Sequence, residues 1–329
     1  MSEKKELVWN AFNNKPVERV PVGFWFHYTG NHPVASVYEH PEMREKNISG
    51  HKKFVNEFKP DFIKLMSDGY FFEPETDSVI KNAKSASDLG KLKLISADDK
   101  WIRDQVSLVR ELTLAFGKDV LTFYNVFAPA TAFKWSAGGD ARLAAFIKED
   151  KHAVIRALSV IAQNTSLLAR AVIKEGGADG IYLSAQTIQD VSVGPDVYAE
   201  VISPSELAVL TSANAVSETN ILHICGYEGA RNNFVLFKNY PAKVINFASV
   251  VEGISLSEGK KLFGGKAVIG GFANTSEGVL YKGTKEEVQA ETKRLISEAG
   301  KTGIILGADC TVPIDTPFER FEWVREAAR

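Results

Sequence analysis

Eight short runs of mostly apolar residues recur along the chain and alternate with stretches that have the character of helices or loops. Continuous apolar runs of this length are typical of strands buried on both faces, as in a parallel sheet. The runs cover residues 22–26, 61–67, 120–127, 180–184, 220–225, 243–248, 267–272 and 303–307. Eight such alternations favour a closed (β/α)8 TIM barrel over an open, doubly wound sheet, because no early strand is followed by a glycine-rich dinucleotide motif.

Two of the intervening stretches carry clear helix signals. Residues 141–174 repeat apolar side chains on one face. Thr284 and Glu287 have the spacing of a capping box at the start of a second helix, and Gly300 marks its end. An amphipathic helix is also expected before the first strand. We therefore predict one α/β domain over residues 1–329, a single TIM barrel with an N-terminal helical extension.

The composition is that of an ordinary soluble globular protein. Of the 329 residues, 45% are hydrophobic and 24% are charged, and the formal net charge is -2. This charge gives no reason to expect nucleic acid or an anionic membrane as a partner. No apolar run approaches the roughly 18 residues of a membrane span, and the N-terminus lacks the apolar segment of a signal peptide. We expect a cytoplasmic protein.

The chain has two cysteines, and one of them stands two residues after a histidine. His223 and Cys225 share the run 220–225, and residues two apart on a strand point to the same face. Cys310 follows the last run. One imidazole and two thiolates suit zinc, with a fourth position left for water or substrate. Two other interpretations stay open: free cysteines of the core, or, less in keeping with a reducing compartment, a disulfide.

In a TIM barrel the active site lies at the C-terminal ends of the strands. Polar side chains at those ends are therefore candidates for binding and catalysis. They are His27, Tyr28, Asp68, Asn125, Thr131, Ser184, Gln186, His223, Cys225, Asn246, Ser249, Asn274, Thr275, Asp309 and Cys310. A metal held between the fifth and eighth predicted strands requires the final loop to bring Cys310 inward.

Seven segments have the sequence of blocks known from one family, namely residues 19–22, 62–68, 127–131, 202–204, 270–274, 283–288 and 313–317. With these segments the chain resembles the uroporphyrinogen decarboxylase superfamily over nearly its whole length. One branch, the zinc-dependent methylcobamide:thiol methyltransferases of the coenzyme M type, is marked by a His-x-Cys pair and a later C-x-x-P turn. His223, Cys225, Cys310 and Pro313 match that pattern position by position.

The sequence departs from the decarboxylases at positions that would hold a porphyrinogen. The loop 26–31 contains no arginine, and the final loop has Ala308 and Asp309 where those enzymes have a histidine. A substrate with eight carboxylates needs cationic groups that neutral side chains do not replace. Asp68 does match the catalytic aspartate of the decarboxylases, although it could also be a strand-end aspartate that caps the next loop.

The sequence also departs from the methyltransferases at two places. After the seventh predicted strand those enzymes usually have Gly-Asn followed by an acid, whereas this chain has Ala273 and Asn274. Some related thiol methyltransferases add a zinc-binding glutamate after the sixth strand, and residues 243–249 offer only Asn246 and Ser249 there. The acceptor or the donor could therefore differ from the well-known ones.

The resemblance implies a zinc enzyme that moves a methyl group from a corrinoid (methylcobamide), carried by a partner protein, to a small thiol. The implied roles are Zn2+ ligation for His223, Cys225 and Cys310 and orientation of the acceptor for Asp68, Tyr28 and Asn274. Two alternatives stay open: a metal-independent decarboxylase of the uroporphyrinogen type, and a non-catalytic subunit that docks the corrinoid protein. The sequence names neither the thiol nor the oligomeric state, and a homodimer is allowed.

Overall fold

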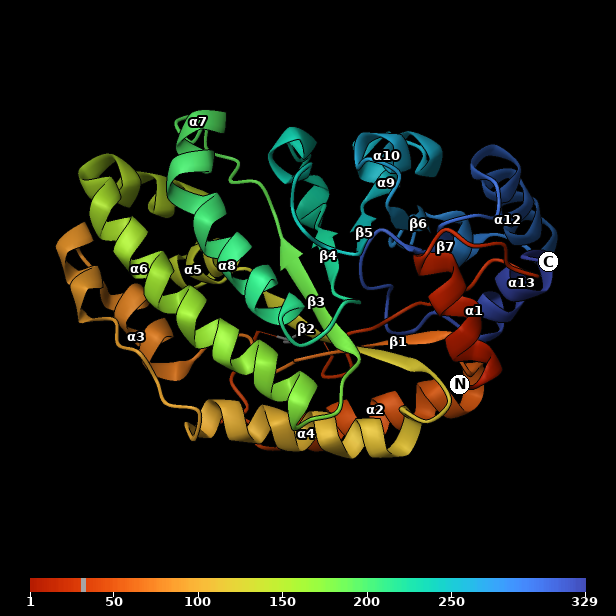
Figure 1. The fold of residues 1–329 in the computed structure, drawn as a ribbon, viewed down its shortest axis with the longest axis horizontal. Coiled ribbons are helices and arrows are strands. Elements are labelled where there is room, and N and C mark those ends of the chain that lie inside the picture. The colour runs from red at the N-terminus through yellow and green to blue at the C-terminus, as the bar shows by residue number, and fades with distance from the viewer. Residues whose placement is uncertain (31–33) are drawn as a thin grey trace.

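A parallel sheet of seven strands forms the centre of the molecule (Figure 1). The computed structural model describes residues 1–30 and 34–329. The strands follow one another in chain order, and each is hydrogen-bonded in parallel to the next. They are β1 (Phe62–Leu65), β2 (Leu121–Phe127), β3 (Gly180–Ala185), β4 (Ile221–Ile224), β5 (Val244–Phe247), β6 (Ala267–Phe272) and β7 (Ile304–Ala308). Seven of the eight predicted runs are confirmed as strands.

The prediction of a strand at residues 22–26 is wrong. The segment makes one isolated bridge, between Val22 and Leu306 of β7. Its backbone still bridges β7 and the start of β1. Gly23 N donates to Leu306 O of β7 (3.0 Å), and Asp61 N, just before β1, donates to Val22 O (3.1 Å). A regular ladder is interrupted because the Val22 N–H donates to the Asp61 carboxylate (2.8 Å). The fold is therefore TIM-barrel-like, with seven strands and an extended segment in the eighth place, and not the closed eight-stranded barrel that we predicted.

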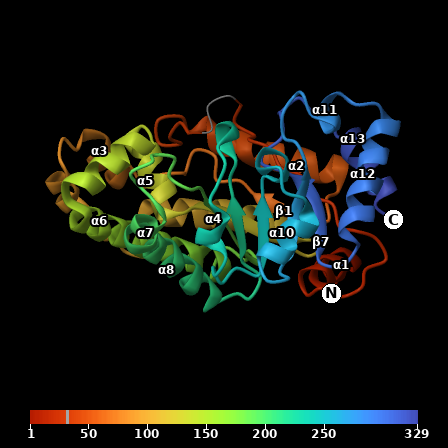
Figure 2. The ribbon, with the colours of Figure 1, turned by 90° about the horizontal axis from the view of Figure 1, so that it is seen from above.

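Helices surround the sheet, and α6 and α8 lie side by side along one flank (Figure 1). The two chain ends lie at the same end of the molecule, near α1 and α13 (Figure 2). None of the described helices is long and apolar enough to span a membrane. The α-helices are α1 (Glu3–Phe12), α2 (Glu42–Phe58), α3 (Pro74–Asn82), α4 (Lys100–Phe116), α5 (Pro129–Ala137), α6 (Asp140–Lys174), α7 (Pro195–Val197), α8 (Ser203–Asn214), α9 (Ser249–Glu252), α10 (Leu256–Leu262), α11 (Val279–Lys282), α12 (Lys285–Ala299) and α13 (Glu319–Ala327). The shorter turns are η1 (Ala86–Lys91), η2 (Tyr198–Ile202, a π-helix), η3 (Tyr227–Gly229) and η4 (Phe234–Phe237).

The helix predictions are confirmed, with one interruption. At α12 the hydroxyl of Thr284 accepts from the backbone of Glu287, and the Glu287 carboxylate accepts from the backbone of Thr284, as a capping box requires. In α6 the backbone of Asp150 is not helical (φ −152°, ψ 93°). Its carboxylate accepts from the N–H groups of His152 and Ala153. Asp150 therefore works as an N-cap inside the predicted helix and divides it into two.

The side chains that point into the barrel form two zones. Near the N-terminal ends of the strands the interior is apolar, and α1 closes it through Val8 and Phe12. Residues two apart on a strand point to the same face, and two residues further along five of the strands the side chains that point into the barrel are polar. The side chains of this zone are Lys64, Asn125, Ser184, His223 and Asn246, none more than 3% exposed. Buried polar groups are costly unless they are paired, so this zone is where a functional site is expected.

Candidate functional site

His223, Cys225 and Cys310 lie together at the C-terminal ends of β4 and β7. Their ligand atoms all lie within 4.8 Å of one another, and the two sulfur atoms are 3.8 Å apart. Both cysteines are free thiols, so the disulfide that the sequence left open is absent from this pair. Two sulfurs that each lie 2.3 Å from a tetrahedral zinc are about 3.8 Å apart. The spacing of the cluster therefore fits the metal that the sequence predicts.

Local backbone structure explains why Cys225 and Cys310 face the same point. Cys225 N donates to Ala185 O (2.9 Å), which extends β4 by one residue beyond its end and keeps Cys225 on the face of His223. After β7, Asp309 N donates to Phe272 O (2.8 Å). The chain therefore keeps the direction of the strand as far as Cys310.

The side chain of Asp309 fixes the loop that carries Cys310. Its carboxylate accepts from the Ser249 hydroxyl (3.1 Å) and from the backbone N–H groups of Val250 and Val251 at the start of α9. Burial raises the pKa of Asp309 to about 6, whereas these hydrogen bonds act in the opposite direction. The contact holds the final loop inward, which is the condition that the metal prediction required.

The electrostatics of the cluster suit a divalent metal. Burial lowers the pKa of His223, which favours the neutral imidazole that binds metals. Neither ring nitrogen of His223 has a hydrogen-bond partner at normal distance. A hydrogen bond from Cys225 holds the pKa of the Cys310 thiol well below its usual value, and the same contact together with burial raises the pKa of Cys225. A buried imidazole with an unused lone pair beside two cysteine sulfurs fits a zinc ion.

Asn246 on β5 provides the second layer of this site. It stands beside His223 in the parallel register of β4 and β5. Its amide nitrogen donates to Ile269 O (3.0 Å), while its amide oxygen is buried and has no partner at normal distance. This oxygen is the group that can accept the N–H of His223 when the other ring nitrogen binds a metal. Such a contact fixes the tautomer and the ring orientation of a metal-binding histidine.

The cluster lies in the wall of a cavity of about 580 Å³. This size is within the range of small-molecule sites. Aromatic and polar side chains from several loops share the wall. The residues that line it are His27, Val34, Lys64, Met66, Phe71, Phe72, Asn125, Phe127, Thr131, Trp135, Ser184, Gln186, His223, Cys225, Gly226, Tyr227, Gly229, Val251, Asn274, Thr275, Cys310 and Thr311.

Asp68 lies behind this wall. It is fully buried, and both of its carboxylate oxygens are engaged. One oxygen lies 2.8 Å from Nδ1 of His27, and the other accepts from the backbone N–H of Tyr28 (2.8 Å) and the hydroxyl of Thr29 (3.4 Å). The carboxylate therefore holds the segment that follows residue 26 and orients the ring of His27, which does line the cavity. A catalytic role for Asp68 stays a prediction.

The other two residues predicted to orient the acceptor differ in position. The ring of Tyr28 packs against His51, with ring centroids 4.2 Å apart, and is not part of the described cavity wall. Asn274 lines the cavity, and its amide nitrogen donates to Thr311 O (3.1 Å). Asn31, the last residue of the arginine-free loop 26–31, lies outside the described residues. The roles of Tyr28 and Asn274 stay predictions.

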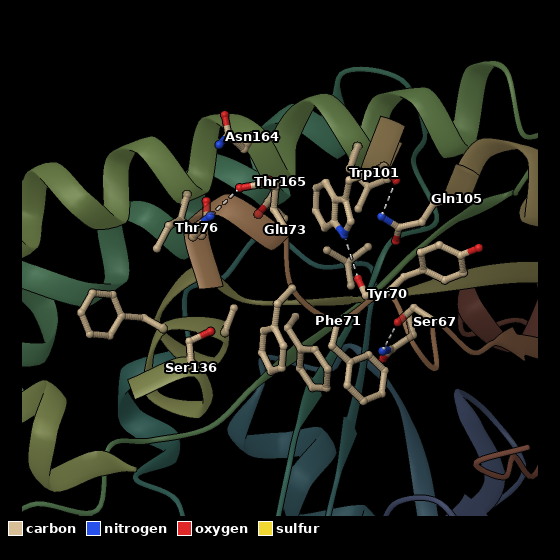
Figure 3. A pocket seen from close by; sticks show the side chains of 18 of the residues that line it. Ser67, Tyr70, Phe71, Glu73, Thr76, Trp101, Gln105, Ser136, Asn164 and Thr165 are labelled. Carbon is tan, nitrogen blue, oxygen red and sulfur yellow. Dashed lines mark hydrogen bonds between the residues drawn. The ribbon is translucent and has the colours of Figure 1, made fainter. Parts of the chain in front are cut away.

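A second and much smaller cavity lies among α3, α4, α5 and α6 (Figure 3). Its volume of about 30 Å³ leaves room for roughly one water molecule. Polar groups beside it are paired: the Glu73 carboxylate accepts from the Thr76 N–H, and the indole of Trp101 donates to Tyr70 O. None of the predicted metal ligands lines it, and among the strand-end candidates in the described part of the chain Asn125 alone does. The larger cavity at the barrel mouth is therefore the candidate site.

Comparison with known proteins places the chain in a family. The uroporphyrinogen decarboxylase (URO-D) family pattern matches residues 63–329. The chain belongs to the uroporphyrinogen decarboxylase family. This confirms the resemblance found in the sequence, and no curated protein sequence matches the chain.

Solved structures share the fold of this family member at low sequence identity. A methyltransferase from Methanosarcina mazei has a TM-score of 0.74 at 16% identity, covering 100% of this chain and 98% of that chain. A B12-independent methionine synthase from a Shewanella species has a TM-score of 0.53 at 12% identity, covering 94% of both chains. A putative vitamin-B12-independent methionine synthase from Listeria monocytogenes has a TM-score of 0.53 at 14% identity, covering 93% and 98%. At these identities the similarity shows the common fold.

Sequence reasoning missed Lys64 as a residue of the site. In the sequence, Lys64 belongs to the family segment 62–68, and the resemblance assigns it no role. The signal was available, because a lysine in the middle of an apolar strand, in phase with Phe62 and Met66, must point into the barrel. His27 and Asn246 are strand-end candidates in the sequence, but the sequence does not indicate their function.

Proposed function

We propose that the protein is a zinc-dependent methyltransferase that transfers a methyl group from a corrinoid, carried by a partner protein, to a thiol. The observation that carries this proposal is the cluster of buried His223 with half-buried Cys225 and Cys310 in the wall of a ligand-sized cavity. Three soft or borderline ligands with an accessible fourth position are typical of catalytic zinc. The match of this ligand pattern to the methyltransferase branch, and the likeness of the fold to the Methanosarcina methyltransferase, support the same function.

The chemistry assigned to each group follows from this arrangement. His223, Cys225 and Cys310 would hold the zinc, which would act as a Lewis acid and keep an acceptor thiol in its deprotonated, nucleophilic form. Aromatic side chains of the cavity, including Phe71, Phe127 and Trp135, exclude water from the sulfur. The acceptor sulfur would form the S–C bond to the methyl carbon, and the electron pair of the broken Co–C bond would stay with the corrinoid. Asn274, which lines the cavity, would orient the remainder of the acceptor.

The surface around the cavity supports a protein partner. Exposed large apolar side chains occur in the connections that follow β3, β4, β5 and β7. They are Val191, Tyr227, Val235, Val250 and Ile314, between 45% and 100% exposed. Exposed apolar side chains near a site favour a protein interaction surface, and one of these five, Tyr227, lies in the cavity wall. A corrinoid protein that presents its cofactor to the cavity would cover them.

The proposal is tested by metal analysis followed by X-ray absorption at the zinc edge. We expect about one zinc per chain, with two sulfur neighbours in the absence of thiol. Addition of 2-mercaptoethanol or another small thiol should add a third sulfur to the zinc shell. A His223→Ala variant serves as the control that loses the metal. Zinc that gains no sulfur from any thiol would be structural, and the proposed function would then be wrong.

A further inference from the structure

Lys64 lies on the floor of the cavity, in the middle of β1. The residue is 3% exposed, and its side chain enters the interior of the barrel, where it lines the cavity. Its ammonium nitrogen lies 4.4 Å from the ring centroid of Tyr182 and 5.2 Å from that of Trp25. Two aromatic faces therefore hold the cation in place by cation–π attraction.

Among the described residues, no carboxylate forms an ion pair with Lys64. Asp68, the nearby carboxylate that follows β1, is committed to His27 and the backbone of Tyr28. The charges that act most strongly on the ammonium group belong to Cys310 and then Cys225. Burial lowers the pKa of Lys64, and the sulfur atoms act in the opposite direction. An unpaired buried cation is costly, so the site needs an anion near Lys64.

The charge count of the metal centre identifies that anion. A zinc ion with two cysteine thiolates and a neutral histidine carries no net charge. Such a centre does not require a positively charged side chain to balance it. Binding of an acceptor as a third thiolate makes the centre negative by one unit. Lys64 is the one lysine or arginine in the described cavity wall, and it returns the sum to zero.

We propose that Lys64 is the counter-charge for the acceptor thiolate, so that its ammonium group stabilises the binding of a third sulfur anion beside His223, Cys225 and Cys310. The inference rests on the proposed function and adds a positioning residue to it. It assigns the charge of Lys64 to the reacting sulfur and not to a distant group of the substrate. The charge should therefore matter equally for thiols of different structure.

The test uses the full-length protein loaded with Co(II), whose sulfur-to-cobalt charge-transfer absorption reports each thiolate ligand. Lys64→Met removes the charge and keeps the length of the side chain, and Lys64→Arg keeps the charge. We expect Lys64→Met to keep its metal affinity within about threefold while its affinity for 2-mercaptoethanol falls by about 10- to 100-fold, equivalent to about 1.4–2.8 kcal/mol. Lys64→Arg should retain most of the thiol affinity.

Two controls make the result specific. Lys134→Met removes another buried lysine, whose charge is already paired with Asp140 and whose loss should leave thiol affinity unchanged. Mercaptoacetate carries a carboxylate, whereas 2-mercaptoethanol is neutral. The affinity of Lys64→Met for both thiols should fall by the same factor. A loss confined to mercaptoacetate would assign Lys64 to the carboxylate and overturn the inference.

The outcomes separate this inference from the proposed function. Thiol binding by the wild type together with unchanged binding by Lys64→Met overturns the role of Lys64 and leaves the methyltransferase proposal intact. Absence of thiol binding by the wild type overturns both. Circular dichroism checks the folding of each variant, and Lys64→Gln provides a second neutral side chain if Lys64→Met is not folded.

Discussion

The sulfur atom of Cys310 is the third proposed ligand of the metal, and replacing it tests whether the cluster is a metal site or part of the core. A serine hydroxyl is a poor ligand for zinc because it stays protonated, so we expect Cys310→Ser to lower zinc affinity at least about 100-fold. The fold should persist, because a barrel of this size does not depend on one site for its stability. Chelator competition measures the zinc affinity, and circular dichroism measures whether the variant is folded.

A control for Cys310→Ser is Thr275→Ser, which changes another residue of the cavity wall and leaves the three ligands in place. Zinc affinity should be unchanged in this variant. Full zinc occupancy in Cys310→Ser itself would show that the cysteine only packs, and it would remove the basis of the metal centre.

Single residues were predictable where their chemistry depends on local geometry. The period of a strand is enough to place His223 and Cys225 on one face, and the structure confirms that they meet Cys310. The inward position of Cys310 depends on the contact between Asp309 and α9, which joins residues about 60 positions apart and has no local signature. Lys64 was missed because the apolar run that contains it was interpreted only as a strand.

At the scale of elements, the extended segment in the eighth place of the barrel depends on the buried carboxylate of Asp61. Its oxygens bind the Arg19 guanidinium at 2.6 and 2.7 Å and also accept the Val22 N–H. Asp61→Asn leaves the half-buried guanidinium without its charge partner, so we expect a loss of about 2–4 kcal/mol in the free energy of unfolding. Urea denaturation measures it.

The matched control for Asp61→Asn is Glu291→Gln, which breaks the exposed pair between Glu291 and Arg294 on α12. Exposed pairs contribute little, so the control should lose less than about 1 kcal/mol. If the two variants lose the same free energy, the segment does not depend on Asp61.

The elements that the sequence misjudged share one physical cause. At Val22 and at Asp150 a carboxylate takes backbone N–H groups that a regular strand or helix would have used. Apolar periodicity reports which face of an element is buried, but it does not report which acceptor a given N–H finds. The capping box at Thr284 was predictable because both partners lie within three residues.

At the scale of the whole molecule, the charge of the cavity limits the substrate. The described wall contains Lys64 and His27 and no arginine. Uroporphyrinogen carries eight carboxylates, and one lysine does not balance them in a cavity with aromatic walls. We therefore expect no meaningful formation of coproporphyrinogen, as measured by fluorescence chromatography of the oxidised products. Clear product formation would favour the decarboxylase alternative and make Asp68 the central residue.

The helical layer outside the sheet contains a buried acid that links global stability to pH. Glu206 on α8 is fully buried, and it accepts hydrogen bonds from the hydroxyls of Tyr198 and Tyr240. Burial raises the pKa of Glu206 from 4.5 to about 7, although the two hydroxyls act in the opposite direction. Between these two values the folded protein holds a proton that the unfolded chain releases. The contribution of Glu206 to stability is therefore full below pH 4.5 and is lost as the pH rises through 7.

Glu206→Gln replaces the acid with a neutral amide of similar shape and removes this dependence. The free energy of unfolding of the variant, relative to wild type, should therefore be higher at pH 8 than at pH 5 by about 1–3 kcal/mol. Urea denaturation at both pH values measures the difference, and titrations elsewhere in the molecule cancel between the two proteins. Glu218→Gln, at an exposed position just after α8, should show no such change. A difference that is the same at pH 5 and pH 8 would mean that Glu206 is ionised in the folded protein at both, and that its tyrosine partners outweigh the cost of burial.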